Sequence, residues 1–216
     1  MDATPFTVTC SLDGWALAWA RLDASECDAA ALAEERARVA ARVRARFAEP
    51  AAVAAHPPTA ALRRLFRASG CDPTRYRPSS EALLRRLLKG DELPAIQPLV
   101  DLNNCLSAEL EAPCCVMRPD SVGCHLELRA GRPGESYLSL KGPFSLEGKP
   151  LLADESGPLD TPITGNQRVK VTADTVRAWL VSYLPAGVLT LDQAWAATDA
   201  LARATGITAV RCLPHP

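Results

Sequence analysis

The sequence predicts a single α+β domain over residues 1–216, with a mixed or antiparallel sheet flanked by helices. Helical periodicity dominates the first half of the chain, and short alternating runs separated by glycine and proline follow Pro113. One more helix and one more strand end the pattern. Because helices and strands are grouped, this order argues against a doubly wound sheet. Residues 48–58 are the best candidate for an internal boundary.

The first half is expected to hold one strand and five helices. The run FTVTC alternates and predicts a strand at residues 6–10, and Asp13 is placed to cap a helix that ends at residue 24. The other helices are expected at residues 28–47, 59–70, 79–90 and 95–110. Ser79 or Ser80 is expected to cap the helix at residues 79–90, and a loop is expected at residues 49–58.

The helix at residues 28–47 carries two distinct faces. Its apolar face consists of Leu32, Val39, Val43 and Phe47. A ridge of basic side chains consists of Arg38, Arg42 and Arg46. We interpret this ridge as a solvated helix face rather than a nucleic-acid surface, because a formal net charge of -1 gives no general attraction to polyanions.

The second half reads as short strands, one helix and a last strand. Strands are expected within GCHLELRA, SYLSLKG and PLLADESG. A helical turn after Thr172 should precede a strand at residues 178–184. TLDQAWAATDALARATG predicts a helix capped by Thr190 or Asp192, and ITAVRCL predicts the final strand.

Composition narrows the protein class. No stretch approaches 18 apolar residues, so no membrane span is expected, and the N-terminus lacks the pattern of a signal peptide. Eight cysteines without an export signal are expected to be free thiols, which favours a cytoplasmic location. Phosphate-binding glycine loops, zinc-protease motifs and nucleophile elbows are all missing from the sequence, so no cofactor is expected.

A polar cluster lies at the end of the helix expected at residues 95–110. Asn103 and Asn104 fall at or beside its apolar face, where a buried amide must find partners or cost about 1–3 kcal/mol. The cluster is either a loop tether or part of a pocket that also contains Glu109 and Cys115. Cys115 is a candidate nucleophile if a base such as His125 lies nearby.

A zinc site is the alternative use of the cysteines. Its ligands would be Cys114, Cys115, Cys124 and His125, but their spacing does not follow the paired pattern of zinc sites. No metal is therefore expected, and the cysteines are interpreted as small core residues.

Three segments in order, RYRPSSEALLRRLLKGDELPAIQPLVDLNNCLSAELEAP, LLADESG and RVKVTADT, resemble the editing domain of the phenylalanyl-tRNA synthetase beta chain. The resemblance is closest to proteins that consist of that domain alone, and it covers about residues 60–185. It implies that the chain has the α+β fold of that editing domain. It also implies hydrolysis of a wrong amino acid from the 3′ end of a tRNA.

The family pattern Val-Asp-x-Thr-Asn-Tyr, followed by Glu-x-Gly-Gln-Pro-x-His, falls on residues 100–115. Val100, Asp101, Asn104, Glu109 and Pro113 match this pattern. Asn103, Cys105, Ala112 and Cys115 replace the family's threonine, tyrosine, glutamine and histidine. Further on, Ala153, Asp154 and Gly165 match, and Gln167 replaces a pocket glutamate.

The resemblance implies a catalytic set and a substrate-binding set. The catalytic candidates are Asn104, Cys115 and Thr164, and the substrate-binding candidates are Asn103, Glu109, Gly165 and Gln167. Arginine side chains suit tRNA phosphates, and the candidates are Arg77, Arg85, Arg86 and Arg168, with a solvated helix face as the alternative for Arg85 and Arg86. The partners implied are an aminoacylated tRNA and, as an alternative, an aminoacyl-tRNA synthetase.

The departures at Cys115 and Gln167 leave two outcomes open, a changed amino-acid specificity or a loss of catalysis. The rivals to a deacylase are therefore a binding module of the same fold and a hydrolase that uses Cys115 as its nucleophile.

Overall fold

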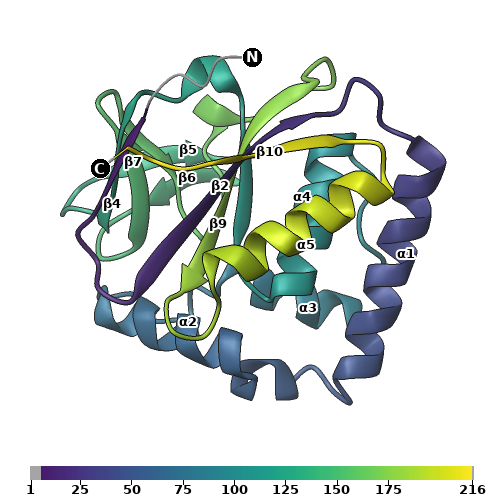
Figure 1. Cartoon of the computed structure of the whole chain (residues 1–216). Helices are drawn as coiled ribbons and strands as arrows, with labels where there is room; N and C mark the ends of the chain where they lie inside the picture. Colours follow the sequence, from purple (N-terminus) through teal and green to yellow (C-terminus); the bar gives the residue numbers. More distant parts are fainter. Residues whose placement is uncertain (1–5, 216) are drawn as a thin grey trace.

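The structure, a computed structural model, describes residues 6–215. Its central element is a four-stranded antiparallel sheet, which we call the central sheet. In spatial order its strands are β10 (Thr208–Cys212), β2 (Trp15–Asp23), β9 (Arg177–Pro185) and β3 (Cys114–Met117). Figure 1 shows β2 and β9 running side by side through the middle of the molecule.

The helix expected at residues 13–24 is wrong, because this segment forms β2. Trp15 and Trp19 pack on one face of the strand, and Ala20 and Leu22 pack on the other. Alanines favour a helix in isolation, but a central strand buries the apolar side chains of this segment on both of its faces. Tertiary burial therefore overrides local propensity here.

A second sheet, which we call the outer sheet, is mixed. Its strands are β1 (Thr7–Cys10), β4 (His125–Ala130), β7 (Pro150–Asp154) and β8 (Gly157–Asp160), of which β1 and β4 are parallel and the other pairs antiparallel. A separate hairpin consists of β5 (Ser136–Ser139) and β6 (Gly142–Ser145). The strands expected in the second half are confirmed, and β3, β6 and β8 are additional.

The helices are α1 (Ala29–Arg46), α2 (Pro57–Ala68), α3 (Ser79–Leu87), α4 (Pro98–Leu110) and α5 (Leu191–Ala204). Asp28 caps α1, and Thr190 caps α5 through a reciprocal pair of bonds with Gln193. Ser79 and Ser80 make no cap for α3, which follows Pro78. The buried Ser80 hydroxyl instead donates to the Glu111 carbonyl, tying α3 to the end of α4. None of the described helices is long and apolar enough to span a membrane.

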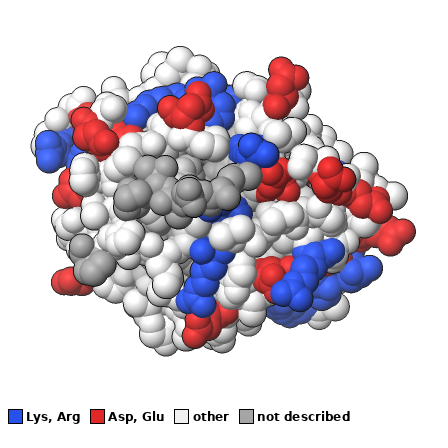
Figure 2. Space-filling model, turned by 45° about the horizontal axis from the view of Figure 1, so that its top comes forward, with Lys and Arg blue, Asp and Glu red and all other residues white. Residues whose placement is uncertain are grey.

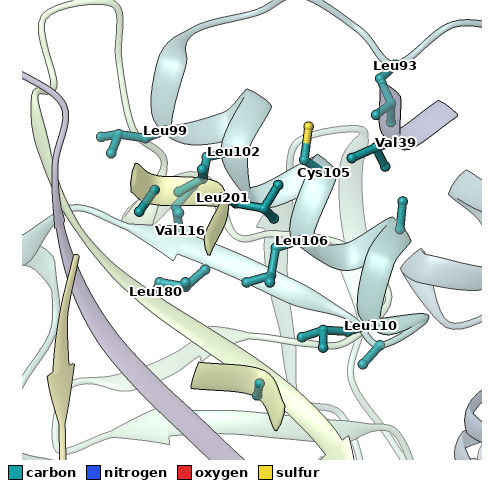
Figure 3. Packing of buried hydrophobic residues seen from close by; sticks show 14 of the residues in the cluster. Val39, Leu93, Leu99, Leu102, Cys105, Leu106, Leu110, Val116, Leu180 and Leu201 are labelled. Atoms are coloured by element: carbon teal, nitrogen blue, oxygen red, sulfur yellow. The ribbon is translucent and has the colours of Figure 1, made fainter. Parts of the chain in front are cut away.

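Two hydrophobic cores lie on opposite faces of the central sheet. On one face, α1, α3, α4 and α5 gather as Figure 1 shows, and Leu102 and Leu106 of α4 point toward Val116 and Leu180 (Figure 3). On the other face, the outer sheet and α2 enclose the second core. Side chains alternate along β3, so Cys114 packs in the first core and Cys115 in the second.

Short single-turn helices complete the chain: η1 (Ala52–Ala55), η2 (Pro119–Ser121) and η3 (Gln167–Val169). The first of these lies within the segment expected to be a loop at residues 49–58. The third follows the strand β8 and carries one of the predicted pocket residues.

Candidate functional site

A buried carboxyl group, that of Asp160, lies between the two four-stranded sheets. Asp160 ends β8 of the outer sheet and is 1% exposed. Its Oδ2 atom accepts a 2.8 Å hydrogen bond from the Tyr183 hydroxyl on β9 of the central sheet. The Cys115 thiol on β3 lies near the same carboxyl group, and it donates at 3.7 Å to the Val116 carbonyl. Because Cys115 lies opposite Val181 in the β3–β9 ladder, Cys115 and Tyr183 point toward the same face.

The loop after β8 folds back over this carboxyl group. Asp160 and Gly165 form an isolated bridge, and the Gly165 carbonyl accepts from the Leu140 amide. Within the loop, the Thr164 carbonyl accepts from the Tyr137 hydroxyl at 2.5 Å and from the Thr161 hydroxyl at 3.0 Å. These bonds attach the loop to the β5–β6 hairpin and hold Thr164 and Gly165 beside Asp160.

Burial sets the protonation states in this cluster. It raises the pKa of Asp160 from 3.8 to about 7, although the hydrogen bond from Tyr183 and the nearby Cys115 thiol act in the opposite direction. Burial also raises the pKa of the Cys115 thiol well above 9.0, and the neighbouring Asp160 raises it further. Cys115 is therefore a protonated thiol that donates a hydrogen bond, whereas a nucleophilic cysteine requires a lowered pKa.

Three of the predicted site residues come together at this point. Cys115 and Gly165 flank Asp160, and Thr164 precedes Gly165 in the same loop, although about 50 residues separate Cys115 from the other two. Gln167 lies on η3 with an exposed side chain, and its Nε2 donates to the Ser139 carbonyl at 3.3 Å. It therefore lies at the rim of the cluster, attached to the β5–β6 hairpin.

The predicted residues on α4 lie elsewhere. Glu109 forms ion pairs with Arg42 and Arg46 of α1. Asn103 has a buried Oδ1 atom without a hydrogen-bond partner. Among residues 6–215, no hydrogen bond connects Asn103 or Asn104 to Cys115, which points into the opposite core. The sequence cluster of asparagines, glutamate and cysteine is thus divided by the central sheet.

The basic ridge on α1 contacts acidic side chains. Arg42 bridges Glu35 and Glu109, and Arg46 contacts the buried carboxylate of Glu111 at 2.8 Å. Glu111 follows α4 with a φ of 55°, the left-handed conformation that side chains other than glycine rarely adopt. The interpretation of this ridge as only a solvated face is therefore corrected, because it joins α1 to the end of α4.

The four arginines proposed for tRNA phosphates differ in their internal contacts. Arg77 and Arg85 pair with the fully buried Glu81, at 3.9 and 3.1 Å. Arg86 pairs with Asp91, and both of these side chains are more than half exposed. The fourth arginine, Arg168, holds the buried Asp154 carboxylate and bonds three backbone carbonyls. On the face drawn in Figure 2, small groups of basic side chains alternate with acidic ones.

The positions of the cysteines and of His125 support neither a zinc site nor a Cys115–His125 catalytic pair. Cys114 and Cys115 point to opposite faces of β3, and the Nδ1 atom of His125 bonds Thr7 rather than a cysteine. Across residues 6–215, no group of three histidine, cysteine, aspartate or glutamate side chains is placed to hold a metal ion. The eight cysteines, all within this range, are free thiols.

Sequence reasoning missed four residues of the cluster: Tyr137, Asp160, Thr161 and Tyr183. Tyr183 carried a usable signal, because a tyrosine in an apolar strand needs a partner for its hydroxyl once buried. Asp160 carried none, since an aspartate just after a short strand most often belongs to an exposed turn.

Comparison with known proteins supplies the family context. The sequence model of the B3/4 domain matches residues 61–204, more than half of the chain. A solved structure, described as an N-terminal fragment of the phenylalanyl-tRNA synthetase beta-subunit from Pyrococcus horikoshii, aligns with 96% of this chain at 12% identity and a TM-score of 0.49. This chain spans 50% of the length of that fragment. A search of curated proteins found no match.

Proposed function

Because the chain belongs to the B3/4 domain family, the family of the phenylalanyl-tRNA synthetase beta-subunit editing domain, we propose that it hydrolyses mischarged aminoacyl-tRNA in trans. One observation carries the proposal. Cys115 and Gly165, which the resemblance assigns to the family's site, lie beside a buried carboxyl group, and Thr164 is held in the same loop by bonds to its carbonyl. The partner is the aminoacylated 3′ end of a tRNA.

The reaction asks little of the protein, because an aminoacyl ester is already activated. The site must hold a water about 3 Å from the ester carbonyl and stabilise the oxyanion that forms. In our proposal the Thr164 hydroxyl and backbone amides near Gly165 do this, assisted by the terminal ribose hydroxyl. Asn103 and Asn104 lie on the other side of the central sheet, so in this proposal they act only through the stability of the fold. Gln167 contacts the amino-acid side chain from the rim.

The tRNA backbone would be held by arginines with exposed guanidinium groups. Arg77 and Arg86 have side chains that are 47% and 56% exposed, so they are the better candidates for phosphate contacts. Arg85 and Arg168 are committed to Glu81 and Asp154, and they act mainly by fixing the fold. With a net charge of -1, binding should be weak and should fall as salt rises.

A second candidate is a binding module of the same fold that holds an aminoacyl end without hydrolysing it. The observation in its favour is the buried, protonated thiol of Cys115 at the position of the family's histidine. A thiol in that state neither activates water nor attacks an ester. The same raised pKa argues against a hydrolase that uses Cys115 as its nucleophile, because a nucleophilic cysteine must be a thiolate.

A deacylation screen separates these functions. The wild type, Thr164→Val and Asn104→Ala would be mixed with a panel of correctly and wrongly charged tRNAs, with Cys114→Ser as a control on the opposite face of β3. We expect ester loss with one wrong pair, slowed roughly 10- to 100-fold by Thr164→Val. Asn104→Ala, across the central sheet from the site, and the Cys114→Ser control should both leave the rate per folded molecule unchanged. Flat time courses while tRNA still binds would replace the deacylase with the binding module.

A further inference from the structure

Asp160 differs from the other buried acids of this chain in having no cation beside it. Four other buried acids each have an arginine partner: Glu35 with Arg42 at 3.0 Å, Glu81 with Arg63 at 2.9 Å, Asp101 with Arg36 at 2.7 Å and Glu111 with Arg46 at 2.8 Å. Within residues 6–215, no lysine, arginine or histidine forms an ion pair with Asp160. Its hydrogen-bond donor is the neutral hydroxyl of Tyr183, and the groups that influence it nearby, the Cys115 thiol and the Thr161 backbone amide, are also neutral.

At the four other buried acids an arginine side chain supplies the cation. A buried carboxylate without a cation raises the free energy of the folded state. Such a group either stays protonated or receives a cation from outside the chain. Neutral donors on one side and an open side toward a ligand are what a receptor for a cation needs.

Asp160 is 1% exposed, and Gly165 and the side chain of Leu140 lie on the side of its Oδ1 atom. A Cβ atom added at Gly165 would lie 3.8 Å from Asp160 Oδ1 and 3.6 Å from Leu140 Cδ1, with nothing closer. Leu140 is 52% exposed, so its side chain can turn away to admit a group to the carboxylate. The neighbouring Leu138 is 50% exposed and adds apolar surface on the same hairpin.

We propose that Asp160 is the receptor for the α-ammonium group of the aminoacyl ester, so that this site selects amino acids with a free amine. The inference rests on the proposed function and adds the substrate class to it. A primary ammonium is compact enough to approach through the space over Gly165, and it carries the charge that Asp160 lacks. The amino-acid side chain then lies against Leu140 at the rim.

The first test needs no variant. Wild-type protein would be given the aminoacyl-tRNA that it hydrolyses in the screen and the same ester after N-acetylation, which removes the charge and keeps the ester. We expect hydrolysis of the acetylated ester to be slower by roughly 100-fold or more, because the buried carboxylate would be left unpaired. Equal rates on the two esters would overturn the inference and leave the deacylase function intact.

The second test asks whether Asp160 is the residue that causes the preference for the free amine. Asp160→Asn keeps the size and the acceptor for Tyr183, and we expect it to reduce the preference for the free amine to a few-fold at most. Cys114→Ser, on the other face of β3, serves as the matched control and should keep the full preference. Retention of the full preference by Asp160→Asn would overturn the assignment.

Failure of the proposed function gives a different pattern. If no ester is hydrolysed, binding of alaninamide and phenylalaninamide, each beside its N-acetylated form, would be measured by calorimetry. Amine-dependent binding that is lost in Asp160→Asn would support the receptor without the deacylase. Binding that ignores acetylation, or no binding of either amide, would overturn the receptor as well.

Discussion

The substitution Asp160→Asn should change how the stability of the protein depends on pH. In the folded state burial raises the pKa of this carboxyl group from 3.8 to about 7. Between these two values the folded protein holds a proton that the unfolded chain has released. The contribution of Asp160 to the stability must therefore fall as pH rises from about 4 to about 7, and it must level off above that range.

The size of this effect follows from the shift. About three pKa units at 1.36 kcal/mol each give a loss of about 4 kcal/mol in the free energy of unfolding across that range. Asparagine does not titrate, so Asp160→Asn lacks this loss. The other titratable groups are common to both proteins and cancel in the difference between them.

Urea denaturation of both proteins, at steps from about pH 4 to about pH 8, measures the difference directly. Relative to its value at about pH 4, the stability of Asp160→Asn should gain about 4 kcal/mol on the wild type by about pH 8. Any packing cost of the asparagine side chain lowers the free energy of unfolding equally at about pH 4 and at about pH 8, so it cancels in this comparison. A difference that stays within about 1 kcal/mol over the whole range would refute the reasoning, because Asp160 would then ionise as an ordinary aspartate.

Three further predictions concern single contacts. Arg168→Ala should lower the free energy of unfolding by about 3 kcal/mol in urea denaturation, because the buried Asp154 loses its cation; a loss below about 1 kcal/mol would contradict this. At about pH 8, iodoacetamide should alkylate the exposed Cys10 rapidly and Cys115 only on unfolding, as mass spectrometry would show; similar rates would disprove the protonated state of Cys115. Asn103→Ala should raise thermal stability by about 1 kcal/mol, since a buried unpaired oxygen disappears from a helix; a loss would point to a bond absent from the structure.

Much of the fold was predictable because the signals are local. The run at residues 28–47 contains its own cap, apolar face and polar face, and it forms α1 with Asp28 as the cap. The failure at residues 13–24 is equally instructive. The segment that forms β2 has apolar residues on both sides, and only its neighbours decide whether such a run becomes a helix or a central strand.

The positions of the candidate residues were predictable only in part. The resemblance pointed to Cys115 and Gly165, which lie near each other beside Asp160, and to asparagines on α4, which lie against the other core. The residue at the centre of the cluster, Asp160, carried no signal in the sequence. Its raised pKa comes from burial, which depends on strands that are distant along the chain.

The sequence by itself determined the helices, most strands, the α+β class and the family, because periodicity, caps and ordered motifs are written in neighbouring residues. Only the tertiary structure decided which side of β3 each cysteine occupies and which acids receive an arginine. Strand register fixes the first, and a shift of one residue would exchange Cys114 for Cys115 beside Asp160. Packing of the helices against one another decides which acids receive an arginine, and packing of the two sheets leaves Asp160 buried without a cation among residues 6–215.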